Sequence, residues 1–173
     1  DLGSNWTAEQ FALIHKAADK ICFLPDSDPA KDGEAFGIGI RAVMKAGHTA
    51  MEHGLTVSVK EIPEGKDGEK QDPDTYIHDM QTFREMEETD FILWVAAKLF
   101  SVSTNTEQKS DAVRHVANLL TFVEDDTKLS MYIDALTQYH RGKLFWQKAV
   151  ENEATRKGKP KENDTDLHRQ YGF

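Results

Sequence analysis

Two short apolar runs, separated by a long helical segment, constrain the fold of this chain most strongly. Residues 21–24 read Ile-Cys-Phe-Leu and are closed by Pro25, a pattern typical of a buried strand. Residues 55–59 alternate apolar and polar side chains, which predicts a second strand. Between them, apolar residues recur at helical spacing over residues 34–53. Strand, helix and strand in this order predict an α/β fold with two parallel strands.

Helical signals dominate the rest of the chain. Thr7 and Gln10 have the spacing of a capping box, so a helix is expected to begin just before the first apolar run. After residue 78 the strand signals end, and apolar residues recur at helical spacing. Four helices are predicted there, over residues 79–100, 107–123, 127–140 and 142–156.

The helical pattern also predicts which side chains form the core of this part. Trp94 and Trp146 are interpreted as core residues, and Met131 and Leu144 are placed on inner helix faces. We therefore expect three segments: residues 1–78 as an α/β part, 79–156 as a small antiparallel helical bundle, and 157–173 as a polar linker or tail.

Charge and composition exclude several classes of protein. The 173 residues carry a net charge of −9, which argues against a strong electrostatic grip on nucleic acid across the whole surface. A local basic groove, or a site where metal ions bridge to phosphate, stays open. No apolar run approaches the ~20 residues that a membrane-spanning helix needs. The single cysteine, Cys22, excludes a disulfide framework and a cysteine zinc site within the chain. We expect a cytoplasmic protein.

Two acidic pairs follow the two predicted strands. Asp26 and Asp28 come directly after the first strand, and Asp72 and Asp74 flank Pro73 in the polar loop after the second. Alternate residues of an extended segment point the same way, so each pair can face one site. Clustered carboxylates are the ligands that Mg²⁺ and Mn²⁺ prefer. The pattern predicts a metal site, although Asp-x-Asp pairs are also common in turns, where they cap helices.

Four cations are candidates for contact with a nucleic-acid backbone or a nucleotide beside that site: Lys31, Arg41, Lys45 and Lys60. The alternative for each of them is an ordinary solvated face.

The segment from Ile21 to Ala35 resembles the TOPRIM segment of bacterial DnaG-type primases, in which a buried strand leads to Asp-x-Asp and then to a helix. Residues 66–77, with Gln-Asp-Pro-Asp-Thr-Tyr near their end, resemble the family's later Asp-Pro-Asp segment. The opening residues 2–10 look like the stretch before the second TOPRIM helix. The predicted helices after residue 78 are similar to the helical subdomain that follows TOPRIM. The strand that runs into Lys-Glu-Ile-Pro looks like primases of the Bacteroides and mobile-element kind.

This resemblance implies a partial TOPRIM domain, with a Rossmann-like parallel sheet, followed by a helical bundle. It implies a role in DNA replication as part of a DNA primase, a nucleotidyltransferase that makes RNA primers. By resemblance, Asp26, Asp28, Asp72 and Asp74 would hold Mg²⁺ or Mn²⁺. The implied partners are a single-stranded DNA template, nucleoside triphosphates and a replicative helicase.

The resemblance is incomplete at one important position. The family carries a glutamate on an earlier strand, and no such residue precedes Asp1. We therefore expect a fragment that lacks the N-terminal part of the domain, assign no catalytic residue, and expect no activity from the chain alone. The family's phosphate-handling glycine corresponds only loosely to Gly33, because Lys31 and Asp32 intervene.

Two alternatives stay open. The first is another TOPRIM enzyme, a topoisomerase or an OLD-type nuclease, which would need a nucleophilic tyrosine or an ATPase domain elsewhere. The second is a non-catalytic module in which an acidic helical half binds a replication partner.

Overall fold

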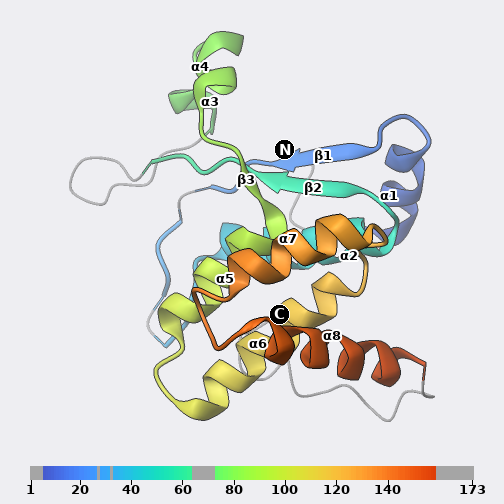
Figure 1. Cartoon of the computed structure of the whole chain (residues 1–173). Helices are drawn as coiled ribbons and strands as arrows, with labels where there is room; N and C mark the ends of the chain where they lie inside the picture. The colour runs from blue at the N-terminus through green and yellow to red at the C-terminus, as the bar shows by residue number, and fades with distance from the viewer. Residues whose placement is uncertain (1–5, 27, 32, 64–72, 159–173) are drawn as a thin grey trace. The chain divides into compact units, whose positions relative to one another are not determined.

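The structure is a computed structural model, and it describes residues 6–26, 28–31, 33–63 and 73–158. Its packing divides into two units between Phe91 and Ile92. Figure 1 shows the whole chain with its elements labelled. The segment from residue 79 to Phe91, which the sequence assigned to the helical part, packs with the first unit. No helix within the described ranges is both long and apolar enough to cross a membrane.

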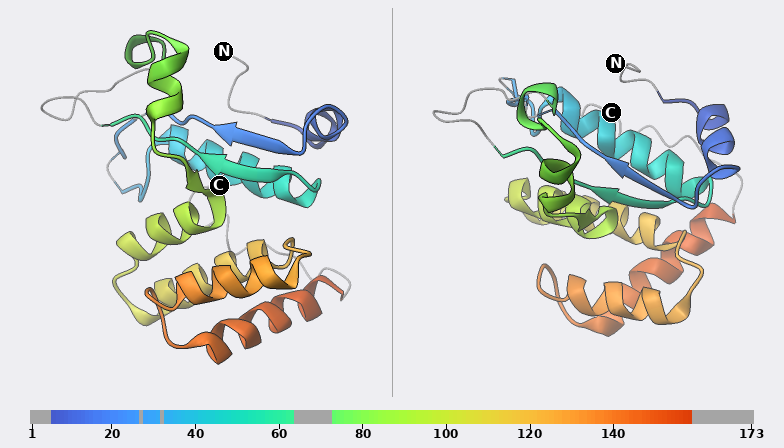
Figure 2. Two further views of the ribbon diagram at one scale, coloured as in Figure 1. Left: turned by 45° about the horizontal axis from the view of Figure 1, so that its top comes forward. Right: turned by 90° about the horizontal axis from the view of Figure 1, so that it is seen from above.

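The first unit contains a small mixed sheet. Its elements are α1 (Ala8–His15), β1 (Lys20–Phe23), α2 (Ile38–Glu52), β2 (Thr56–Val59), α3 (Pro73–Tyr76), α4 (Met80–Glu85) and β3 (Thr89–Asp90). β1 and β2 are parallel, with Lys20 opposite Thr56 and Phe23 opposite Val59, which confirms the predicted strand pair. The strand order is β1-β2-β3. In Figures 1 and 2, α2 runs along the sheet, and it packs against β2.

The prediction of one helix over residues 79–100 is wrong. Asp79 caps α4 by accepting a hydrogen bond from the Thr82 N–H at 2.7 Å, and α4 ends where Met86 takes an extended conformation. Thr89 and Asp90 then form β3, antiparallel to β2, so the sheet is not purely parallel as the sequence predicted. A two-residue strand has no periodicity of its own, and it forms here because β2 offers an edge with unpaired backbone groups.

Aromatic side chains form one end of the core of this unit. Phe11 is fully buried, with its ring stacked on Trp6 at 5.5 Å and edge-on to Phe23 at 6.3 Å between centroids. The capping box of Thr7 and Gln10 is present, which confirms the predicted start of α1. Edge-to-face pairs of this kind add about 0.5–1.5 kcal/mol to the burial of each ring.

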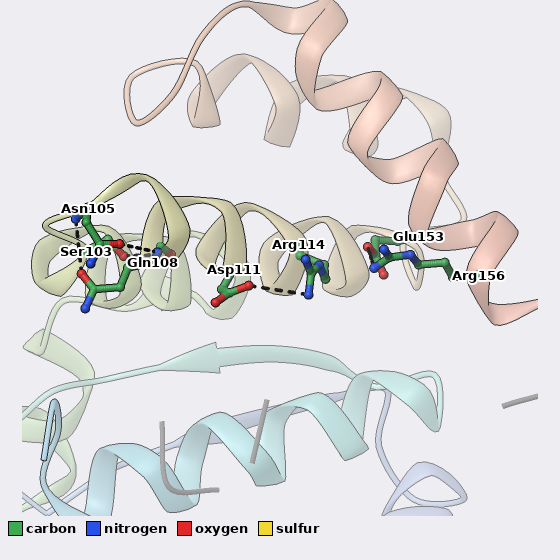
Figure 3. Close-up of polar contacts among 7 residues, drawn as sticks. All are labelled: Ser103, Asn105, Gln108, Asp111, Arg114, Glu153 and Arg156. Carbon is green, nitrogen blue, oxygen red and sulfur yellow. Dashed lines mark hydrogen bonds and ion pairs between the residues drawn. The ribbon is translucent and has the colours of Figure 1, made fainter. Parts of the chain in front are cut away.

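The second unit is helical, as predicted. After the first residue of α5 (Phe91–Val102) it contains the rest of that helix, α6 (Thr106–Leu120), α7 (Asp126–Leu136) and α8 (Lys143–Lys157). Asn105 and Gln108 make a reciprocal capping box at the start of α6, shown in Figure 3. Trp94 and Trp146 are buried, which confirms their interpretation as core residues.

Two predicted core residues of this unit are wrong. Met131 and Leu144 are 68% and 64% exposed. Ile133 and Leu136, which the same pattern placed on the inner face of α7, are buried as predicted, and Tyr132 is buried with them in place of Met131.

Candidate functional site

The acid-bearing loop lies at the carboxyl edge of the parallel strand pair. Asp26 and Asp28 lie in the loop after β1, three and five residues beyond its last residue, and both are half-buried. The N–H of Lys60, just after β2, donates to the carbonyl of Phe23 at 2.9 Å, so the two strands end side by side. In open α/β sheets, ligands bind beside the carboxyl ends of the strands. The structure therefore puts the first acidic pair where such sites occur.

Two glycines hold this loop against the start of α2. Gly37 is the N-terminal cap residue of α2, and a Cβ there would overlap the carbonyl oxygen of Asp28. A Cβ on Gly39 would lie 2.8 Å from the carbonyl oxygen of Asp26. The main chain of both aspartates thus packs against the first turn of a 15-residue helix, whose end carries a partial positive charge.

Gly37 and Gly39 are not among the site residues predicted from the sequence. Gly33, which was compared with the primase glycine, has a φ of 83° and open space where a Cβ would lie. The signal that points to the other two is the Gly-Ile-Gly at residues 37–39, placed at a helix start after an acidic loop. Glycine at such a point lets another backbone approach closely.

The second acidic pair is only partly within the described residues. Asp74 lies in α3 and is exposed, and Asp72 falls outside the described ranges. Across the ranges that the structure describes, no three His, Cys, Asp or Glu side chains form a group able to hold a metal ion. The convergence of the four carboxylates stays a prediction. Asp26 and Asp28 supply two carboxylates, whose oxygen atoms suit a hard divalent cation.

The four predicted cations differ in their surroundings. Lys31 and Lys45 are exposed. Arg41 is half-buried, and its Nη2 atom lies 2.9 Å from Oε2 of Glu34, in the loop before α2. Lys60 is 5% exposed. Its ammonium donates to the carbonyl of Phe83 at 2.7 Å and lies 4.5 Å from the centroid of the Phe83 ring, which fastens β2 to α4.

An ion pair joins the start of β1 to the segment before β3. Lys20 Nζ lies 2.5 Å from Oε1 of Glu88. This hydrogen bond lowers the pKa of Glu88 and raises the pKa of Lys20 from their ordinary values. Both side chains are partly exposed, so the pair contributes at most about 1 kcal/mol.

The fold has a counterpart among solved structures. The crystal structure of a DNA primase domain from Pseudomonas aeruginosa matches 84% of this chain with a TM-score of 0.56 and 15% sequence identity. The chain has a fold similar to that of a DNA primase domain. The Aquifex aeolicus primase (zinc binding and RNA polymerase domains) matches 76% of the chain at 20% identity, with a TM-score of 0.48.

The similarity covers only part of the length of each primase structure. The chain spans 44% of the length of the Pseudomonas aeruginosa primase domain and 29% of the Aquifex aeolicus chain. No protein-family model and no curated protein matches the sequence. The similarity therefore concerns the fold.

Proposed function

We propose that this chain is part of a DNA primase of the TOPRIM type, and that it supplies metal ligands for the synthesis of RNA primers. The observation that carries the proposal is the acidic loop at the carboxyl edge of β1 and β2, held against α2 by Gly37 and Gly39. It occurs in a chain whose fold is similar to that of a primase domain.

The donor chemistry of this loop suits Mg²⁺ or Mn²⁺. Asp26 and Asp28 would hold the ion, and Asp72 and Asp74 would complete its ligands. When bound, such an ion neutralises a triphosphate and activates a hydroxyl nucleophile. The chain's own contribution is to fix the carboxylates. Close packing of the loop backbone on α2 limits its movement, and a ligand set must be held within about 0.5 Å to work.

Two groups around the loop have supporting roles in this proposal. Arg41, held by Glu34 at 2.9 Å, lies in the first turn of α2, where a cation favours a bound phosphate. Lys31 and Lys45 are exposed and would contact the phosphate backbone of a template or primer. Lys60 has a different role, because its ammonium is already bonded to Phe83.

Primer synthesis by the longer parent protein tests the proposal. Labelled ribonucleotides would be incorporated on a single-stranded DNA template with Mg²⁺, and the Asp26→Asn form of the parent should make no primers. The Glu124→Gln form, which removes one exposed charge from the second unit, should retain full synthesis. Unchanged synthesis by the Asp26→Asn form would refute the proposed role. The 173-residue chain alone should make none.

A further inference from the structure

The helical unit carries its charge differently from the rest of the chain. Residues 92–158 contain nine Lys and Arg against eight Asp and Glu, although the whole chain has a net charge of −9. The predicted helical half, residues 79–156, is acidic because it includes five Asp and Glu of residues 79–91, which pack with the first unit. The basic residues of the helical unit are also unevenly distributed, because Arg141, Lys143, Lys148, Arg156 and Lys157 all lie in or just before α8.

A groove of about 510 Å³ runs between α6 and α8. Its lining includes Arg114 from α6 and Lys148 and Arg156 from α8, with Glu153 as the one acidic residue. Its volume is within the range of about 300–1,000 Å³ that is usual for ligand sites. The lining therefore has a net positive charge in an otherwise acidic protein.

Ion pairs position two of these cations. Arg156 Nη1 lies 3.1 Å from Oε1 of Glu153, which is 8% exposed. Arg114 Nη1 lies 3.6 Å from Oδ1 of Asp111. The four residues are labelled in Figure 3. A guanidinium has five donors, so one ion pair leaves donors for a second anion. Lys148 is exposed in the middle of α8.

An aromatic ring lines the same groove. Phe145 is half-buried, packs edge-on against the core residue Trp146 at 6.0 Å, and has the Arg141 guanidinium 5.7 Å from its centroid. The groove also includes the polar side chains of Ser110 and Asn152. Sites for single-stranded nucleic acid combine these two features: a cationic groove that follows the phosphates and an aromatic ring on which a base stacks.

We propose that the groove between α6 and α8 binds single-stranded nucleic acid, with Arg114, Lys148 and Arg156 on the phosphates and Phe145 against a base. An acidic protein segment would use the cations but would gain little from the ring. The binding is argued from this groove alone, and its assignment to template or primer rests on the proposed function.

The test is the anisotropy of a labelled dodecathymidylate with the whole chain, in EDTA, over a range of salt concentrations. EDTA removes any contribution from metal ions at Asp26 and Asp28, so failure here leaves the primase proposal standing. Arg114→Gln with Lys148→Gln should weaken binding and reduce the slope of log affinity against log salt by about 1.4, at about 0.7 for each phosphate contact. Phe145→Leu should weaken binding about fivefold or more with the slope unchanged.

The control is Lys98→Gln with Lys128→Gln, which removes the same charge from α5 and α7 of the same unit and should leave the slope unchanged. Thermal unfolding shows whether each variant is folded, and Lys148→Gln alone, at an exposed position, should still lower the slope. Equal slopes in all variants would overturn the proposal. So would displacement of the oligonucleotide by polyglutamate as effectively as by unlabelled oligonucleotide.

Discussion

The carbonyl of Asp28 packs so closely on Gly37 that the space of any Cβ at residue 37 is already taken. One contact thus links the acidic loop after β1 to the first turn of α2. Any larger residue at position 37 must displace the loop or the start of the helix. The position of the candidate metal ligands and the stability of this unit therefore depend on the same glycine.

Gly37→Ala should lower the free energy of unfolding by about 1–3 kcal/mol, because overpacking against a backbone carbonyl forces the loop to move. Gly142→Ala is the matched control. Gly142 is also a helix N-cap with a negative φ, but a Cβ there meets nothing within 4 Å. The free energy of unfolding of the control should fall by no more than the difference between Gly and Ala as helix N-caps, about 1 kcal/mol. Chemical denaturation measures both, and equal losses would contradict the packing.

Gly47→Ala should destabilise the chain, although Gly→Ala inside a helix ordinarily stabilises by about 1 kcal/mol. The reason is that a Cβ on Gly47 would overlap the ring of Phe91, which is fully buried. We expect a net loss of about 1–3 kcal/mol in thermal unfolding. Adding Phe91→Leu should recover part of it. A stabilised Gly47→Ala protein would show that the ring has room to move.

Acid should weaken the link between β1 and the segment before β3. The Lys20 hydrogen bond holds the pKa of Glu88 below its ordinary value, so this stabilisation is complete above the unfolded pKa of about 4.5. It is lost as pH falls through the lower folded pKa. Glu88→Gln should cost at most about 1 kcal/mol at pH 7 and nothing at pH 2. The midpoints of urea unfolding at pH 7 and pH 2, compared between the two proteins, measure this loss of stability. Glu87→Gln, at the exposed neighbour, should show no such difference.

Substitutions of Lys60 and Lys45 should have opposite effects, because Lys60 stabilises the fold and Lys45 is proposed to contact DNA. Lys60→Met removes a charge-assisted hydrogen bond to the Phe83 carbonyl, so it should lower stability by about 1–3 kcal/mol. Its affinity for single-stranded DNA should not change. Lys45→Met removes an exposed charge from α2, so it should leave stability within about 0.5 kcal/mol and weaken DNA binding. Unfolding and anisotropy measurements test both roles. Weaker DNA binding by Lys60→Met, or lower stability of Lys45→Met, would contradict them.

Local patterns predicted most of the regular structure. The capping box of Thr7, the apolar run at β1 and the helical spacing of α2 are each encoded within a few residues, and all formed as expected. β3 could not be predicted, because its two residues become a strand only by pairing with β2. Met131 was misplaced because a helical pattern leaves the inner stripe uncertain by one residue until the packing partner is known.

The candidate ligand residues were predictable from the sequence, but the contacts that hold them in place were not. The Asp-x-Asp pair after a buried strand marked Asp26 and Asp28 from the sequence. The approach of Gly37 and Gly39 to them, and the burial of Lys60 under Phe83, depend on contacts between segments far apart in the chain. No local pattern encodes such contacts.

Mn²⁺ binding, followed by electron paramagnetic resonance of the purified chain, tests the central claim most directly. We predict a bound-ion signal that Asp26→Asn with Asp28→Asn abolishes. The control, Glu124→Gln with Glu151→Gln, removes the same charge at two exposed positions of the second unit and should preserve the signal. A titration unchanged by the aspartate substitutions, or weakened equally by the control, would contradict the assignment of a metal site to the loop after β1.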